Sequence, residues 1–382
     1  MIAYFKLGYA YKDIINCLAL SHGITMSLIT LKRMLRSLQL RRRHPCTEEI
    51  VENAVNFIQN ELQGSGQMIG YKAMWRRLQN EGIVISSHTV RHLMLHLDEE
   101  GVRQRRMRRL RHREYVSPGP NFVWHVDGYD KLKPYGFAIH GAIDGFSRRV
   151  MWLEVGVSNN NPRVCVKYFL ETIQRIKVLP RVVRCDHGTE NVHIRDVQVY
   201  FREGYDDDFA GEHSFLQGKS SSNQRIESWW AMLRRKCTTY WMNLFKDMTF
   251  CGLLDTGYIL HIHALRFCFM DLIADDLTRT ATEWNTHLIQ SKKGMEGPRG
   301  RPDIMYFQPQ VYDTESFGIP YNAEDVFTLL HELERNDCVV DDHDPDFIEL
   351  VNLLIPNWEI PMDLKSALDL YANIIDSVEA MQ

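Results

Sequence analysis

The hydrophobic positions of the first 115 residues recur every three or four residues, which is the spacing of amphipathic helices. The pattern breaks after His22 at Gly23 and resumes as a basic amphipathic stretch. A second helical unit starts at Thr47, which two acids follow in the manner of a helix N-terminus. We therefore predict helix-turn-helix units over 1–45 and 46–115 that bind DNA. A helical dimerisation or packing module is the alternative interpretation.

Over residues 118–248 the pattern changes to short β-branched and aromatic runs, such as FVWHVDGY and RVVRCDHG, separated by helical stretches. The runs predict strands, in the order β-β-β-α-β-α-β-α. Three hairpin-linked strands followed by crossover helices indicate an α/β fold with a mixed five-stranded sheet flanked by helices. A right-handed crossover places the fourth strand beside the first.

The last part of the chain reads as helical but differs in charge. A helical extension and a basic linker occupy 249–302, and a mostly helical acidic region occupies 303–382. Residues 1–115 hold 19 Lys and Arg against 10 Asp and Glu, whereas residues 303–382 hold 2 against 18. This asymmetry predicts that the basic N-terminal part, residues 1–115, faces nucleic acid. No apolar run approaches the roughly 20 residues of a membrane span, so no membrane partner is expected.

The run RQRRMRRLRHR has seven arginines in eleven positions, Arg103 to Arg113, and cannot pack on itself. It predicts either an extended phosphate-binding segment or a nuclear localisation signal, and a solvated linker is the plain alternative. A nuclear protein is the expectation. The candidate DNA contacts in this run are Arg105, Arg106, Arg108 and Arg109.

Three acids stand out by their positions. Asp127 lies in the first expected strand of the sheet, Asp186 ends the fourth, and Glu227 lies on the helix after a Gly/Ser-rich loop. Adjacent first and fourth strands would bring the two aspartates together, and the helix could add Glu227. Converging carboxylates repel one another and favour hard ions such as Mg²⁺ or Mn²⁺. Two such ions can activate a water and stabilise the leaving oxygen of a phosphodiester. A surface ion pair is the alternative role for Glu227.

The segments HVDGY, RCDHGTEN and SSSNQRIESWW resemble, in this order, the three motifs of the retroviral integrase and DDE transposase superfamily. The resemblance covers about 120–302. It implies an RNase H-like fold, with Asp127, Asp186 and Glu227 as catalytic residues that bind two Mg²⁺ or Mn²⁺ ions. The sequence departs from the family at two positions that are not metal ligands, because His187 stands where Asn is common and Gln224 where Gly is common.

The resemblance further implies a polynucleotidyl transferase that processes DNA 3′ ends and joins them to target DNA. Element ends and target DNA are the expected partners, with a homo-oligomer and without a small-molecule substrate. Further candidate DNA contacts are Arg91, Lys219, Arg225 and Arg234, and Glu190 is a possible accessory acid. Two alternatives remain open: a domesticated, catalytically idle DNA-binding or scaffold protein with the same fold, and an RNase H-type nuclease.

Overall fold

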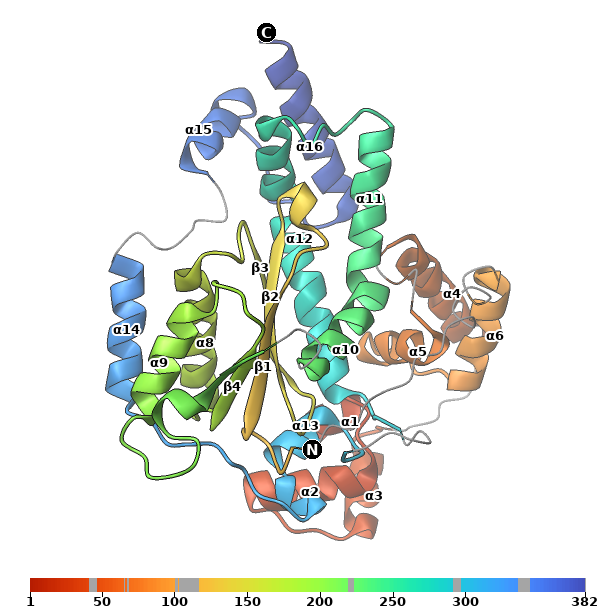
Figure 1. Cartoon of the computed structure of the whole chain (residues 1–382). Coiled ribbons are helices and arrows are strands. Elements are labelled where there is room, and N and C mark those ends of the chain that lie inside the picture. The colour runs from red at the N-terminus through yellow and green to blue at the C-terminus, as the bar shows by residue number, and fades with distance from the viewer. Residues whose placement is uncertain are drawn as a thin grey trace. The chain divides into compact units, whose positions relative to one another are not determined.

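The computed structural model describes residues 1–40, 47–64, 66, 69–99, 102, 117–218, 223–290, 297–335 and 344–381. The chain divides into two compact units (Figure 1). The first, called the helical unit, consists of Met1–Val116, Arg234–Tyr240 and Thr282–Thr314. The second, called the sheet unit, consists of Ser117–Leu233, Trp241–Ala281 and Glu315–Gln382. Among the described residues, no helix combines the length and the hydropathy that a membrane crossing requires.

The N-terminal part of the helical unit is built from helices whose ends follow from local sequence. Its helices are α1 (Ile2–Lys6), α2 (Tyr11–His22), α3 (Leu28–Ser37), α4 (Glu48–Gln63), α5 (Tyr71–Asn80) and α6 (Ser87–Leu97). Gly23 ends α2 in the left-handed region at φ 67°. The hydroxyls of Ser27, Thr47 and Ser86 cap α3, α4 and α6. The pairs α2–α3 and α5–α6 lie where the sequence predicts helix-turn-helix units, and their binding to DNA stays a prediction.

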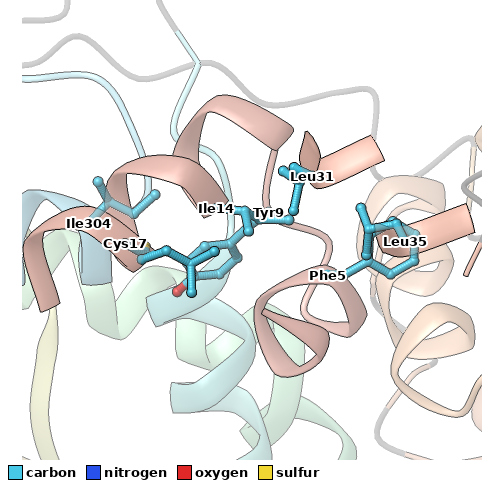
Figure 2. Close-up of a cluster of buried hydrophobic side chains, with 8 residues drawn as sticks. Phe5, Tyr9, Ile14, Cys17, Leu31, Leu35 and Ile304 are labelled. Atoms are coloured by element: carbon cyan, nitrogen blue, oxygen red, sulfur yellow. The ribbon is translucent and has the colours of Figure 1, made fainter. Parts of the chain in front are cut away.

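The segment 282–314 belongs to the core of the helical unit. Ile304, on the short helix α13 (Pro302–Phe307), joins a buried cluster from α1, the α1–α2 turn, α2 and α3 (Figure 2). The other members of that cluster are Phe5, Tyr9, Ile14, Cys17, Leu18, Leu31 and Leu35. Arg301 donates to the carbonyl oxygen of Gly8 at 2.6 Å, and its guanidinium lies 4.9 Å from the Tyr9 ring centroid. A segment that follows the predicted core in sequence thus completes the N-terminal fold.

A buried ion-pair network joins the same segment to α5. Arg77 Nε donates to Glu283 Oε1 at 2.8 Å, and Arg77 also pairs with Glu61 on α4. Lys236 Nζ lies 3.8 Å from the second oxygen of Glu283. Removal of one partner from such a network leaves a buried charge uncompensated, so these residues fix how segment 282–314 joins the helices.

Ile304→Ala should destabilise the helical unit, because it removes methyl groups from a side chain that is only 4% exposed. We expect a loss of about 2–4 kcal/mol, measured as faster amide hydrogen exchange in α2 and α3. Phe307→Ala, on the same helix but at a residue that is 55% exposed, is the matched control and should change little. Equal effects of the two substitutions would contradict the role of Ile304 in this core.

The sheet unit contains the mixed five-stranded sheet that the sequence predicts. The strands are β1 (Val123–Tyr129), β2 (Ala138–Asp144), β3 (Val150–Gly156), β4 (Val182–Cys185) and β5 (Phe215–Gln217). Their order is β3-β2-β1-β4-β5, with antiparallel pairing within the first three strands and parallel pairing of β1 with β4 and of β4 with β5. The predicted α/β, RNase H-like fold and the adjacency of the first and fourth strands are confirmed.

Helices cover both faces of the sheet (Figure 1). On one side lie α8 (Pro162–Ile176) and α9 (Val192–Arg202), with α14 (Ala323–Arg335) packed against α8. On the other side α10 (Gln224–Leu233) packs against β1 and β2, and α11 (Thr239–Phe250) and α12 (Ile259–Thr286) follow it. The C-terminal helices are α15 (Pro345–Leu354) and α16 (Leu364–Glu379).

Side chains of β1 alternate between these two layers, as strand geometry requires. Trp124 is fully buried and meets the ring of Phe169 on α8 edge to face, with 6.1 Å between ring centroids. The odd-numbered positions His125, Asp127 and Tyr129 instead contact Asn223 or Trp230 at α10. The same strand therefore supplies the hydrophobic core with one face and the candidate site with the other.

A buried histidine on β2 makes the sheet unit sensitive to acid. His140 Nδ1 accepts from the Trp152 indole at 3.1 Å, so the ring proton sits on Nε2, which donates to Asn191 Oδ1 at 3.3 Å. Burial lowers the pKa of His140 from 6.5 to about 4. These hydrogen bonds favour the neutral imidazole over the imidazolium, because a second proton on Nδ1 would point at the Trp152 N–H donor.

The free energy of unfolding should fall as the pH drops from 6.5 toward 4, because only the unfolded chain binds a proton at His140 in that window. The contribution is on the order of 3 kcal/mol. Urea titrations at several pH values should show a shallower pH dependence for His140→Gln than for the wild type. The comparison of slopes separates His140 from His125, whose pKa burial also lowers, to about 3. Parallel slopes for the two proteins would refute this assignment.

Candidate active site

The two aspartates are brought together by the parallel pairing of β1 with β4. The register pairs His125 with Arg184, so two residues further along each chain Asp127 and Asp186 occupy equivalent positions. Neighbouring strands lie about 5 Å apart. On its other side Asp127 pairs with Gly141 of β2. Both aspartates are half-buried, and Asp186 Oδ1 accepts from the backbone N–H of Gly188 at 3.1 Å.

Glu227 lies in the first turn of α10, where the helix dipole favours a carboxylate. The start of this helix is fixed by Asn223, which is buried and accepts the first helical hydrogen bond, from Glu227 N to Asn223 O, at 3.2 Å. The Glu227 side chain is exposed, and it makes no ion pair with any residue that the structure describes. Its basic neighbours Arg225 and Arg234 are therefore not ion-pair partners of Glu227.

Asp127 is the most perturbed carboxyl of the three. Burial raises its pKa to about 7, and the negative charges of Asp186 and Glu227 act in the same direction. The indole of Trp230 opposes this shift by donating from Nε1 to Asp127 Oδ2 at 2.7 Å. A strongly shifted carboxyl beside a specific donor and other acids is typical of functional sites.

The surroundings of Glu227 also disfavour its charge. Partial desolvation raises the pKa of Glu227 although the residue is exposed, and the charge of Asp186 raises it further. The three carboxyls thus lie close enough to influence one another. Within the described ranges, however, no three His, Cys, Asp or Glu side chains stand close enough together to hold a metal ion as they are placed.

A fourth carboxyl, Glu190, lies in the same neighbourhood. Its pKa is raised by partial burial and by the charge of Asp186, and its Oε1 accepts from the Asn191 side chain at 2.7 Å. A Cβ at Gly188 would meet the Glu190 carboxyl group. The loop after β4 therefore carries Asp186 and Glu190 near enough for the charge of one to affect the other.

The expected DNA contacts are spread over both units. Arg91 is exposed on α6, with its guanidinium 5.9 Å from the Tyr71 ring centroid, and Arg234 is exposed in the helical unit. Arg225 is half-buried and donates from Nε to the carbonyl oxygen of Gly145 at 3.0 Å, which ties α10 to the turn after β2. The remaining candidates lie outside the described residues, namely Arg105, Arg106, Arg108, Arg109 and Lys219.

Two residues of the site, Asn223 and Trp230, were not selected from the sequence. Asn223 bridges α10 and β1, since its Oδ1 accepts from His125 Nδ1 at 2.7 Å and its Nδ2 donates to Val126 O at 2.9 Å. Trp230 reaches Asp127 from the other end of the helix. A signal was present: Asn223 and Trp230 flank Glu227 at positions −4 and +3, so all three recur near one helix face.

Residues 114–302 match the family of the integrase core domain. This stretch of the chain is therefore similar to the integrase core domain, a family of the retroviral integrase and RNase H-like superfamily. The family is one of integrase- and transposase-like polynucleotidyl transferases, and integrase domains generally bind DNA. A comparison with curated proteins gave no match.

Asn223→Ala should loosen the start of α10. It removes the partners of two polar groups, His125 Nδ1 and Val126 O, at a fully buried position, which costs about 1–3 kcal/mol. Amide hydrogen exchange in the first turn of α10 should become faster. Gln224→Ala is the matched control, because Gln224 makes no side-chain hydrogen bond to a described residue. Unchanged exchange in Asn223→Ala would contradict the bridging role.

Proposed function

We propose that the protein is a metal-dependent polynucleotidyl transferase that processes DNA 3′ ends and joins them to target DNA. Asp127, Asp186 and Glu227 are the proposed metal ligands and catalytic residues. The observation that carries the proposal is the β1–β4 register, which sets Asp127 and Asp186 side by side, together with the rise of the Asp127 pKa to about 7 by burial and by the charges of Asp186 and Glu227.

The donor set fits Mg²⁺ or Mn²⁺ by its chemistry, because it offers only hard carboxylate oxygens. Asp127 and Asp186 are positioned by the sheet, and Trp230 also holds Asp127, whereas the Glu227 side chain is exposed in the first turn of α10. Bound in pairs, such ions lower the pKa of a water and stabilise the leaving oxygen of a phosphodiester. Glu190 stands beside Asp186 as an accessory acid that can orient water or DNA.

The proposed reaction consists of two successive phosphoryl-transfer steps. In the first, a water oxygen bonds to phosphorus and the 3′ oxygen of the DNA end leaves as a hydroxyl. In the second, the oxygen of that 3′ hydroxyl bonds to a target phosphorus and loses its proton to solvent, while the target strand's own 3′ oxygen is displaced, takes a proton from solvent and leaves as a hydroxyl. Both steps exchange one P–O bond for another and need no redox partner. The helices α3 and α6 are proposed to bind the DNA through phosphate and major-groove contacts.

A non-catalytic DNA-binding protein with the integrase fold is the second candidate. One observation favours it: the carboxyls of the described chain, as placed, do not form a closed group of metal ligands. Thermal unfolding with increasing Mn²⁺ separates the candidates, since a ligand that binds only the folded state raises its stability. A melting temperature that does not respond to Mn²⁺ would favour the non-catalytic protein.

Asp127→Asn should abolish Mn²⁺-dependent processing and joining of oligonucleotide duplexes while it leaves the fold intact. We expect a loss of about a hundredfold or more, because the proposed ions contribute several kcal/mol. Without Mn²⁺ the variant should be at least as stable as the wild type, since it removes a charge that burial and two acids disfavour. Lost activity together with unchanged or higher stability would indicate a lost metal ligand, whereas a damaged fold would lower both.

The control for that experiment is Asp206→Asn, the same chemical change at an exposed acid of the sheet unit. It should retain the activity of the wild type. Full activity in Asp127→Asn, with a wild-type protein that processes and joins DNA, would remove Asp127 from the proposed ligands.

A further inference from the structure

The contact between Trp230 and Asp127 connects the Glu227 helix directly to the β1 aspartate. Trp230 is buried, and its Nε1–H donates to Asp127 Oδ2 at 2.7 Å. This length lies at the short end of the normal range for N–H···O hydrogen bonds. Since Trp230 follows Glu227 by three residues, the two side chains start from neighbouring positions on the helix surface. The helix that carries one proposed ligand therefore also holds another.

The sheet is shaped to receive the indole. Gly141 pairs with Asp127 across β1 and β2, and a Cβ at Gly141 would lie 2.9 Å from Trp230 Cη2 and 3.2 Å from the Trp152 carbonyl oxygen. The Tyr129 ring lies against the indole at a centroid distance of 5.2 Å. A glycine directly beside the indole and an aromatic wall next to it leave the ring little freedom to move.

A second contact sets the rotation of the helix. Asn223, seven residues before Trp230, bonds to His125 and to the Val126 carbonyl group. Seven residues are close to two helical turns, so both contacts lie on one face of α10. The helix is thereby fixed at both ends along β1, and Trp230 is presented to Asp127 in one orientation.

We propose that Trp230 is a positioning residue that fixes the Asp127 carboxylate for cation binding. The bond to Oδ2, together with the backbone N–H of Gly128, sets the orientation of the carboxylate toward a cation that it would hold. Carboxylates that bind metals are commonly oriented by such outer hydrogen bonds, and their loss lowers metal affinity by about 10–100-fold. This inference rests on the proposed function, because it requires a cation at Asp127.

The test measures Mn²⁺ binding to the full chain by calorimetry, so that it does not depend on a DNA substrate. Trp230→Phe keeps an aromatic ring but loses the donor, and we expect its Kd for Mn²⁺ to rise by about 10–100-fold. Trp241→Phe is the matched control: it removes an equivalent buried bond in the sheet unit, from Trp241 Nε1 to Asp276 Oδ2 at 3.0 Å. The control should bind Mn²⁺ like the wild type even where its melting temperature falls.

A second variant covers the case in which Trp230→Phe does not fold. Gly141→Ala retains the indole but pushes a methyl group against it, and it should weaken Mn²⁺ binding in the same direction. Wild-type affinity in a folded Trp230→Phe, or in Gly141→Ala where the former does not fold, would overturn the positioning role and leave the proposed function standing. A wild-type protein that binds no Mn²⁺ would overturn both.

Discussion

The ionised form of a carboxyl group is disfavoured when the group is buried beside other carboxylates. This constraint applies to Asp127, the acid at the centre of the candidate site. Asp127 is half-buried on β1, and the charges of Asp186 and Glu227 add to the effect of burial on its pKa. An ionised group in such a place needs donors or counter-ions. The chain supplies two donors, the Trp230 indole and the backbone N–H of Gly128. The remaining imbalance is the physical reason for proposing that these carboxyls bind a divalent cation.

The topology delivers this arrangement through the central strand. β1 lies between β2 and β4, so its side chains meet α8 on one face of the sheet and α10 on the other. Trp124 serves the hydrophobic core, and the next odd-numbered positions, His125 and Asp127, serve the site. A shift of one residue in the register of β1 would turn Trp124 toward α10 and Asp127 toward α8. Burial of Trp124 against α8 therefore also fixes the side of the sheet on which Asp127 lies.

The sequence was sufficient for the features that depend on local periodicity and chain handedness. Alternating strands and right-handed crossovers place Asp127 and Asp186 on neighbouring strands. The bonds of Asn223 and Trp230 depend instead on how α10 is rotated about its axis against β1, which a local pattern does not set. The contribution of Ile304 to the N-terminal core was also hidden, because α13 has only 6 residues, too few for a helical period to stand out. Its burial comes from a long-range contact.

One acidic helix lies on the side of the sheet that faces away from α10. Helix α14 is strongly acidic and packs on α8, behind the face of the sheet that α10 covers. Its exposed or half-buried acids are Glu324, Asp325, Glu332 and Glu334. DNA carries a negative charge on every phosphate, so an acidic helix beside α10 would repel the proposed substrate. The placement of α14 on the opposite side of the sheet keeps this charge away from α10, which is the side from which the proposed DNA substrate would approach.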